Sequence, residues 1–329
     1  MKKNIAIVFG GYSSESVVSE KSLKGLLSFI DTQHYNLFPV LITREEWSMV
    51  VEERHYPINR NDFSAVINGE TVKIDCAYIT IHGAPGENGQ LQGYFEMIGL
   101  PHTTCSLLPS ALTFNKFTCN TYLKGFGVAV ADSLLIRKGT EFDAKEIGEK
   151  LGFPCFVKPN AGGSSFGISK VKEEAGIIPA IEKALVESDE VIIEKFIAGR
   201  EVTCGLFKTR HQTTIFPLTE VVTKNEFFDY EAKYTPSMAE EITPAPVSDN
   251  IRDNIQKIAS AIYDILGMKG IARMDFMIGE NKIYLLEVNT TPGMTATSFI
   301  PQQIKAAGLD LKEVFALIIE DAIERNQTH

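Results

Sequence analysis

The sequence has few cysteines and no long hydrophobic segment, and both absences narrow the class of protein. Its five cysteines are spread over 329 residues without a CxxC pair, which argues against a zinc site or a disulfide framework and for reduced thiols. No apolar stretch approaches the roughly 18 residues that span a bilayer. The apolar run Ile5 to Phe9 is too short for a signal peptide. We therefore expect a cytoplasmic protein with no membrane partner.

Positive charge is also scarce. The chain has 32 Lys and Arg residues against 42 Asp and Glu residues, which gives a formal net charge of −10. A nucleic-acid partner is not expected, because such a chain has no broad basic field. Any phosphate group that the protein binds must be held by a few well-placed lysines and arginines.

Several familiar motifs are missing. The first glycine loop, GGYSSES, lacks the GxGxxG fingerprint of dinucleotide binding, and no GK[ST] follows the later glycine turn as it would in a Walker A loop. There is no GxSxG nucleophile elbow, and the six histidines do not have metal-ligand spacing. A nicotinamide oxidoreductase, which the opening strand and loop would allow, is therefore a weak alternative.

The length allows two or three domains with substantial cores. The pattern changes near Gly99 to Pro101 and again at Val191, so we expect units at 1–100, 101–190 and 191–329. The first reads as a βαβ-like parallel sheet, with strands at 2–9, 37–42 and 76–81 and a helix at 14–30. Its loops Gly10-Gly11 and His82-Gly83 should share the sheet edge at which ligands collect.

The later units combine strands and helices. We expect helices at 110–123, 143–151, 249–266 and 311–324, and strands at 155–158, 169–171, 191–197, 201–207 and 213–222. The polar segment Thr223 to Ser248 is long for a loop in a compact domain and is more often a functional lid than filler.

The segment Gly270 to Gly293 is the most informative one. Its period of two predicts two strands joined at 279–281. Arg273 and Asp275 should share a face of the first strand, and Glu287 and Asn289 a face of the second, with the apolar residues 272, 274, 276, 284, 286 and 288 opposite. Two carboxylates and an amide oxygen suit Mg²⁺. A solvated polar face is the alternative, but an apolar strand that ends in Glu and Asn favours a metal site.

Three other segments could contribute to a ligand site. In KPNAGGSSFG the glycines, serines and Lys158 have the ingredients of a phosphate cradle, although an ordinary hairpin turn is as good an interpretation. Lys116 is either a second phosphate contact or a solvated lysine. In IIEKFIAGREV, Glu194 and Glu201 could meet an adenine amine and a ribose, or could lie on a charged edge strand. His82 could bind a ligand or could hydrogen-bond within its loop.

In this order the segments resemble the D-alanine–D-alanine ligases of the ATP-grasp superfamily almost from end to end. The resemblance rests on GGYSSESVVS, HGAPGENGQLQG, VKPNAGGSSFG, EKFIAGRE, FFDYEAKY, ARMDF and LEVNTTPGMTATS. It implies an α/β protein with a three-domain ATP-grasp architecture and a Rossmann-like parallel sheet at the N-terminus. It also implies an enzyme that joins two D-alanines for peptidoglycan synthesis through a D-alanyl phosphate, releasing ADP and phosphate, and a homodimer.

The resemblance further implies the roles of individual residues. Two Mg²⁺ ions, or Mn²⁺, would be held between the ATP phosphates by Asp275, Glu287 and Asn289. ATP would contact Lys116, Lys158, Glu194, Lys195, Phe196, Ile197, Glu201, Phe227 and Phe228. The first D-alanine would meet Glu15, which is linked to Ser164 and Tyr234, and Lys233 would contact phosphate. Arg273 and the Gly293 backbone N–H would stabilise the oxyanion, and Ser298 with Phe299 would hold the second D-alanine. His82 is a further candidate for substrate binding.

The chain departs from the family pattern at Asn88, Asn115, Ala161 to Gly163, Phe196 and Phe228. None of these changes removes an expected metal ligand or catalytic group. Tyr234 is retained where relatives that make D-alanyl-D-lactate commonly have Phe, so the chain resembles a dipeptide-forming enzyme. The alternatives are a D-alanine–D-lactate ligase and a non-catalytic ATP-binding regulator with the same fold.

Overall fold

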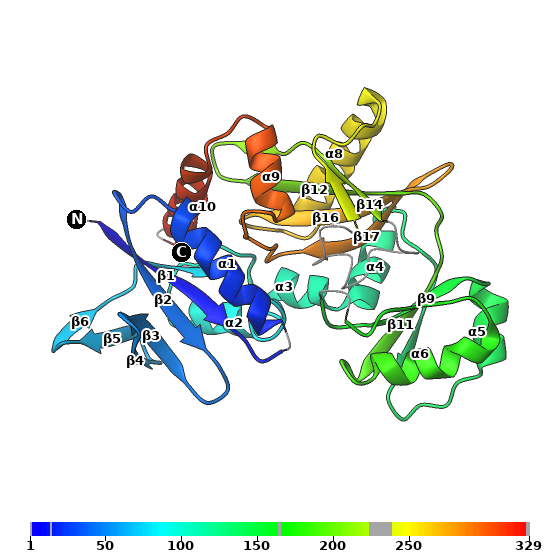
Figure 1. Ribbon diagram of the computed structural model, residues 1–329, viewed down its shortest axis with the longest axis horizontal. Helices are drawn as coiled ribbons and strands as arrows, with labels where there is room; N and C mark the ends of the chain where they lie inside the picture. Colours follow the sequence, from blue (N-terminus) through cyan, green and yellow to red (C-terminus); the bar gives the residue numbers. More distant parts are fainter. Residues whose placement is uncertain (1, 14, 164–165, 224–238, 327–329) are drawn as a thin grey trace.

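The computed structural model of the chain describes residues 2–13, 15–163, 166–223 and 239–326, and the strands in these ranges form three sheets (Figure 1). The first comes from the N-terminal region, the second from the centre of the chain, and the third from the C-terminal half. The α/β class expected from the sequence is confirmed.

The N-terminal sheet has the strand order β6-β5-β4-β3-β2-β1-β7. Its strands are β1 Lys3–Gly10, β2 Tyr35–Ile42, β3 Trp47–Val51, β4 Arg54–Asn59, β5 Ser64–Ile67, β6 Glu70–Val72 and β7 Cys76–Ile79. As expected, β1 pairs in parallel with β2 and β7, and helix α1 (Ser16–Phe29) follows β1. Tyr12 N donates to Ala84 O (2.8 Å), so the two loops predicted to share an edge do lie together.

The four strands β3 to β6 were not predicted, and they extend this sheet with antiparallel pairs. A local signal was available for one of these pairs. Asn68 and Gly69 both have positive φ angles (50° and 88°) in the turn between β5 and β6, and Asn-Gly is the preferred dipeptide of a two-residue hairpin turn.

The central sheet has the order β10-β9-β11-β8. Its strands are β8 Ser133–Arg137, β9 Cys155–Pro159, β10 Ser169–Val171 and β11 Glu190–Lys195. The helices α5 (Ala144–Leu151) and α6 (Ile177–Ala184) lie beside it (Figure 1). Strand β11 ends at Lys195 rather than at Ile197 as predicted.

The single helix predicted at 110–123 is wrong. Two helices, α3 (Leu107–Phe114) and α4 (Lys116–Lys124), meet at Asn115. Asn115 has extended backbone angles (φ −90°, ψ 97°), and its side chain accepts a hydrogen bond from Thr118 N. It therefore caps the second helix instead of continuing the first.

The third sheet has the order β15-β14-β12-β16-β17, with β13 also paired to β12. Its strands are β12 Arg200–Lys208, β13 Thr213–Ile215, β14 Thr219–Thr223, β15 Ala239–Ile242, β16 Ala272–Ile278 and β17 Ile283–Asn289. The strand predicted at 213–222 is two strands, because Pro217 lacks the N–H that a continuous ladder needs. The predicted lid at 223–248 contains β15, and its residues 224–238 lie outside the described part of the chain.

The hairpin β16–β17 corrects one detail of the prediction. Asp275 pairs with Glu287, which puts the two carboxylates on one surface as expected, but Phe276 pairs with Leu285, so Leu286 forms a bulge. An extra residue reverses the alternation beyond it. Leu285 is therefore buried in the core (2% exposed), whereas Leu286, predicted on the apolar face, lines the pocket described below.

The remaining helices cover the first and third sheets. They are α2 Gln90–Met97, α8 Asp249–Ile265, α9 Phe299–Ala306 and α10 Leu311–Asn326. Ser248 caps α8, and the Asp310 side chain accepts from Lys312 N at the start of α10, as expected. Within the described ranges, every helix is too short or too polar to cross a membrane.

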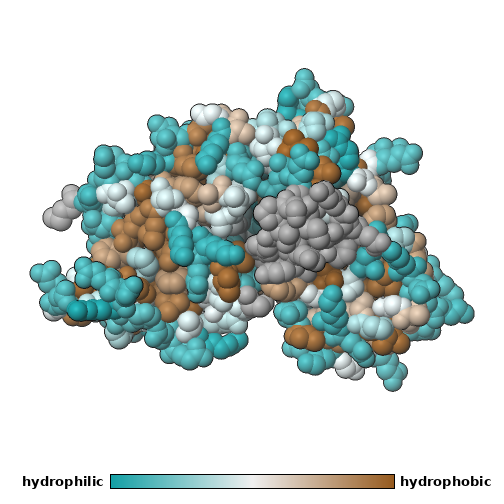
Figure 2. Space-filling model, viewed as in Figure 1, coloured by the Kyte–Doolittle hydropathy of each residue, from teal (hydrophilic) through white to brown (hydrophobic). Residues whose placement is uncertain are grey.

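The C-terminal helices complete the core of the N-terminal sheet. Ile5 and Phe29 share one buried cluster with Ile300, Phe315 and Ile319, and α10 lies beside α1 and β1 in Figure 1. Figure 2 shows hydrophobic residues gathered over the part of the surface that contains α1. The two ends of the chain therefore form one packed unit.

Candidate functional site

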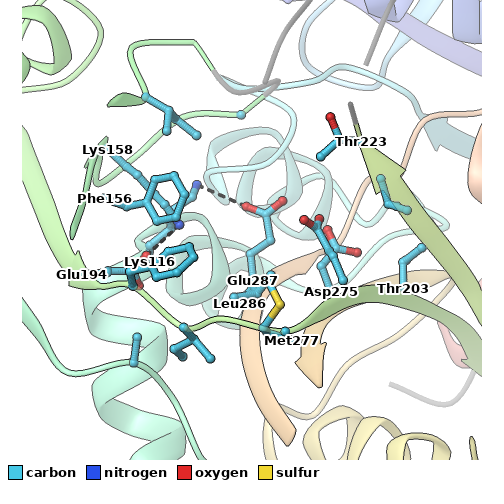
Figure 3. A pocket seen from close by; sticks show the side chains of 18 of the residues that line it. Lys116, Phe156, Lys158, Glu194, Thr203, Thr223, Asp275, Met277, Leu286 and Glu287 are labelled. Carbon is cyan, nitrogen blue, oxygen red and sulfur yellow. Dashed lines mark ion pairs between the residues drawn. The ribbon is translucent and has the colours of Figure 1, made fainter. Parts of the chain in front are cut away.

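A pocket of about 390 Å³ lies between the central sheet and the third sheet (Figure 3). Eleven of the residues selected from the sequence line it: Lys116, Lys158, Glu194, Lys195, Phe196, Ile197, Glu201, Arg273, Asp275, Glu287 and Phe299. They come from seven elements, which are α4, β9, β11, β12, β16, β17 and α9, and from the segment after β11. The fold therefore brings sequence motifs that are far apart in the chain together around one pocket.

On the central-sheet wall, Lys158 and Glu194 form a buried ion pair. Lys158 Nζ lies 2.7 Å from Glu194 Oε2, and Asn120 Nδ2 donates to the other carboxylate oxygen (3.2 Å). Burial by itself lowers the pKa of Lys158, but the Glu194 carboxylate outweighs it, and the net shift is upward. Lys158 therefore stays charged inside the pocket. The ring of Phe156, which Lys158 also contacts, lies against Phe196 (6.0 Å between centroids).

Lys116 connects the glycine turn to the opposite wall. Its backbone N–H donates to Asn160 O (3.0 Å), and its ammonium donates to Gly162 O. Its Nζ also lies 3.8 Å from Glu287 Oε2, and Figure 3 shows the two side chains pointing toward each other. With a side chain only 14% exposed, Lys116 is not a solvated surface lysine.

On the third-sheet wall, the hairpin brings the predicted groups onto one face. Arg273 donates two hydrogen bonds to Asp275 (2.9 and 2.8 Å), and Asn289 Nδ2 donates a third (3.2 Å). Glu287 Oε1 lies 3.9 Å from the Arg273 guanidinium. Burial lowers the pKa of Arg273, but Asp275 and Glu287 outweigh it and raise the pKa. The guanidinium is therefore permanently charged.

Thr203 is a pocket residue that sequence reasoning missed. It pairs with Asp275 across β12 and β16, it is 2% exposed, and it lines the pocket. Its hydroxyl has no hydrogen-bond partner among the described residues. The alternation of β12 was the available signal, because Glu201 and Thr203 must share a face.

Glu15 lies between two glycine loops beside this pocket. A Cβ on Gly163 would lie 2.7 Å from Glu15 Oε1, and one on Gly83 would lie 3.0 Å from Oε2. Glu15 is 5% exposed. Both loops therefore approach one carboxylate closely, and this places Glu15 at the junction of the N-terminal and central sheets.

His82 and Glu87 lie on the same loop of the N-terminal sheet. Burial, assisted by Arg273, lowers the pKa of His82 to about 4, so the ring is neutral at pH 7. It lies 3.3 Å from the hydroxyl of Ser22. Glu87, which sequence reasoning missed within HGAPGENGQLQG, accepts from Gly83 N (2.7 Å), and burial with the nearby Glu15 raises its pKa to about 8.

The predicted residues Gly293, Ser298 and Phe299 follow β17. Ser298 Oγ accepts a hydrogen bond from Thr295 N (3.0 Å), and a Cβ on Gly293 would lie 3.0 Å from that oxygen. The Arg273 guanidinium lies 5.2 Å above the ring of Phe299. Arg273 therefore connects this loop to the hairpin carboxylates.

Five predicted site residues lie outside the described part of the chain. They are Ser164, Phe227, Phe228, Lys233 and Tyr234. Their predicted contacts are not tested by the structure.

The hairpin fits a hard divalent cation by its chemistry. Asp275, Glu287 and Asn289 offer oxygen donors that converge on the pocket face of adjacent strands. No group of three or more His, Cys, Asp or Glu side chains suited to a metal occurs among the described residues. Mg²⁺ usually binds through one or two carboxylates and completes its shell with waters and phosphates.

Two sheets that close on a pocket lined by lysines and a carboxylate hairpin define the ATP-grasp class. The chain belongs to the D-alanine–D-alanine ligase family. Residues 4–105 match the sequence profile described as "D-ala D-ala ligase N-terminus", and residues 122–320 match "D-ala D-ala ligase C-terminus".

Individual relatives are similar over the whole chain. The D-alanine–D-alanine ligase of Phocaeicola vulgatus is 58% identical, covering 98% of this chain and 99% of its own. That of Parabacteroides distasonis is 56% identical, with full coverage of both chains.

Solved structures give the same fold. The VanG D-Ala:D-Ser ligase of Enterococcus faecalis superposes with a TM-score of 0.87 at 32% identity, covering 98% of this chain and 100% of its own. The Bacillus anthracis D-alanine–D-alanine ligase complexed with ATP has a TM-score of 0.79 at 28% identity, covering 100% of this chain and 99% of its own.

Proposed function

We propose that this protein joins two molecules of D-alanine to D-alanyl-D-alanine with consumption of ATP, as a step of peptidoglycan synthesis in cell wall formation. The supporting observation is the similarity to relatives named D-alanine–D-alanine ligase, which is 50% to 58% identity over nearly the entire chain. Because the similarity covers both chains from end to end, we assign the activity of the whole relative to this protein.

ATP is the proposed co-substrate in the pocket. Lys116 and Lys158 would neutralise its phosphates, and Lys195, Phe196, Ile197 and Glu201 would surround the nucleoside, with Glu194 holding Lys158 in place. Phe227 and Phe228 are expected to close this side. Phosphoryl transfer depends on positioning and charge neutralisation more than on covalent chemistry, and two buried lysines in a chain of net charge −10 supply that locally.

Asp275, Glu287 and Asn289 would hold two Mg²⁺ ions, for which Mn²⁺ could substitute. Bound there, the ions would neutralise phosphate charge as phosphoryl transfer proceeds. Arg273 keeps Asp275 oriented from within the sheet through two hydrogen bonds.

The two amino acids would bind on the side of the N-terminal sheet. Glu15 would hold the ammonium of the first D-alanine, whose carboxylate is activated as the acyl phosphate, together with Ser164, Lys233 and Tyr234. Arg273 and the Gly293 N–H would stabilise the oxyanion formed when the second amine attacks. Ser298 and the Phe299 N–H would hold the second carboxylate, and a neutral His82 would contact substrate without adding charge.

We also propose a homodimer in the cytoplasm. The division into units at 1–100, 101–190 and 191–329 stays a prediction. Limited proteolysis and the molar mass in solution measure these properties independently of the reaction.

The test is ADP release from Mg-ATP with D-alanine, with L-alanine, and with D-alanine plus D-lactate or D-serine. We expect ADP and D-alanyl-D-alanine from D-alanine alone and no product from L-alanine. D-Serine is included because the VanG neighbour is a D-Ala:D-Ser ligase.

Other outcomes would replace the proposal. Preferential use of D-lactate or D-serine as acceptor would make the protein a ligase for that acceptor. ATP binding without ADP release in every mixture would favour a non-catalytic regulator with the same fold.

A further inference from the structure

Glu241 has no role in the site described so far, yet its carboxylate reaches the proposed acceptor loop. It lies in β15, next to Val221 of β14, which lines the pocket. Glu241 Oε2 accepts a hydrogen bond of 2.6 Å from Gln302 Nε2 in helix α9. The bond therefore joins the third sheet to the first turn of the helix that begins at Phe299.

Gln302 also contacts the residues that precede its helix. Its Nε2 also donates to Thr297 O (2.7 Å), and its backbone N–H donates to Ser298 O (3.3 Å). A side-chain amide nitrogen has two protons, one for each acceptor. Only Nε2 can serve a carboxylate and a carbonyl together, so the orientation of the amide follows from its partners.

Thr297 and Ser298 belong to a tight turn. Ser298 N donates to Thr295 O (3.0 Å), and Ser298 Oγ accepts from Thr295 N. The direction of the Ser298 hydroxyl therefore depends on where Thr297 and Thr295 hold the turn. Glu241 acts on this turn through one side chain, Gln302.

The helix itself does not need this bond to stay in place. Ile300 and Ile304 of α9 are fully buried. The neighbouring Gln303 is buried as well, accepts from Gly205 N, and donates to Thr203 O and Thr219 Oγ1. Gln303 thus anchors α9 to the sheet, whereas the Glu241–Gln302 bond acts on the turn before the helix.

We propose that Glu241 is a positioning residue for the acceptor site, which holds Gln302 so that the turn presents the Ser298 hydroxyl and the Phe299 N–H to the carboxylate of the second substrate. This inference rests on the proposed function. The hydrogen bond of the Glu241 carboxylate goes to Gln302, but the carboxylate also lies in the field of Arg273. An effect through the hydrogen bond should fall mainly on the second D-alanine, whereas an effect through the charge on Arg273 should appear equally in Glu241→Ala and Glu241→Gln.

The experiment compares Glu241→Ala with Glu241→Gln. Loss of a hydrogen bond to a charged group predicts about a tenfold rise in the KM of the second D-alanine for Glu241→Ala. The matched Glu241→Gln keeps an oxygen that accepts from Gln302, so its KM should stay near that of the wild type. Positional isotope exchange within ATP needs only the first D-alanine and should be unchanged in both variants.

A second pair of variants protects the test against misfolding. Gln302→Met removes this bond from the other side at similar volume and also removes the bond to Thr297 O, so its KM should rise at least as much as that of Glu241→Ala. The double variant should be no worse than Gln302→Met alone, because that variant already removes the bond to Glu241. Thermal unfolding measured for each protein checks that the fold is retained.

The opposite results would overturn the inference. An unchanged KM in Glu241→Ala would show that the bond does not position the turn. Equal losses in isotope exchange and in acceptor KM would show a general structural role. Equal losses in Glu241→Gln and Glu241→Ala would show that charge, and not the hydrogen bond, matters. Failure of the wild type to form any dipeptide would instead remove the proposed function before the variants are compared.

Discussion

The two walls of the pocket carry charge in different ways. On the central-sheet wall, Lys158 and Glu194 form a closed pair at 2.7 Å, and both side chains are less than one-fifth exposed. On the third-sheet wall, Glu287 lies 3.8 Å from Lys116 and 3.9 Å from Arg273, so neither of these cations is at hydrogen-bond distance. The carboxylate of the first wall is buried with its lysine, whereas the Glu287 carboxylate of the second wall is more exposed to the pocket (28% against 8% for Glu194).

This difference suggests a division of labour. A closed ion pair holds its side chains in one geometry before any ligand arrives, which favours recognition. A carboxylate that is more exposed to the pocket is accessible to an incoming cation. We therefore expect changes on the third-sheet wall to affect the reaction most, and changes on the central wall to affect stability as well.

The largest effect is expected for Glu287→Gln. Removing one carboxylate of the proposed metal site should lower kcat by about a hundredfold to a thousandfold, in the range seen when a group that stabilises transition-state charge is lost. ADP release measured against Mg²⁺ concentration, with Mn²⁺ binding followed by electron paramagnetic resonance, reports both consequences.

Glu280→Gln, in the turn of the same hairpin, is the matched control and should behave as the wild type. Full activity of Glu287→Gln at saturating Mg²⁺ would mean that the hairpin is not the metal site. The expectation that changes on the third-sheet wall affect the reaction most would then be wrong.

Lys158→Met and Lys116→Met sharpen the comparison, because each removes one pocket lysine. Both should lose affinity for ATP. Lys158→Met should also lose about 3 kcal/mol of stability, since it leaves Glu194 buried without its cation. Lys116→Met should lose about 1 kcal/mol at most, because Glu287 keeps Arg273 nearby and is more exposed. Urea unfolding of both variants measures the difference, and equal losses would contradict the distinction.

The sequence predicts the third-sheet wall well and the rest of the pocket in part. Arg273, Asp275, Glu287 and Asn289 were found because two-residue alternation is local to one hairpin. The bulge at Leu286 was not predicted, because it depends on how the paired strand packs.

Residues contributed by distant strands were missed for a different reason. Glu241 enters the site through the pairing of β14 with β15, and that register is set by tertiary contacts. The alternation of β12 placed Thr203 on the face of Glu201, but only the pairing of β12 with β16 puts it beside Asp275. The break at Asn115 likewise follows from its contact with the glycine turn, where residues 115 and 161 form an isolated bridge. The Asn-Gly turn at 68–69 could have been recognised from sequence alone.

His82 offers a neutral counterpart to the two charged walls. Its pKa is about 4 in the folded protein, against an ordinary value of 6.5, so between these values the unfolded chain binds more protons. Stability should therefore fall as the pH falls through 6.5, and the contribution of His82 between pH 7 and pH 5 is about 2 kcal/mol. His82→Gln should flatten this dependence in urea unfolding at the two pH values, whereas substitution of the exposed His211 by Gln should leave it as in the wild type. If the free energy of unfolding of the wild type and of His82→Gln depended on pH in the same way, His82 would not be held neutral by burial.

The smallest effect is expected for Asn115→Asp, at the foot of the central wall. Asn115 Nδ2 donates to Glu190 Oε2 (3.3 Å), and Asn160 and Arg137 donate to the same carboxylate. An aspartate would still cap α4 through its other oxygen, but it would face Glu190 with like charge. Arg137 and solvent would screen most of that repulsion, so we expect a loss of about 0.5 kcal/mol in the free energy of unfolding and a rise of less than about threefold in the KM for ATP.

The double variant Asn115→Asp with Glu190→Gln should recover the wild-type KM, because it exchanges the donor and the acceptor of the same bond. A large loss that Glu190→Gln does not rescue would show that Asn115 acts on Lys116 directly, and the central wall would then be less rigid than its closed ion pair implies.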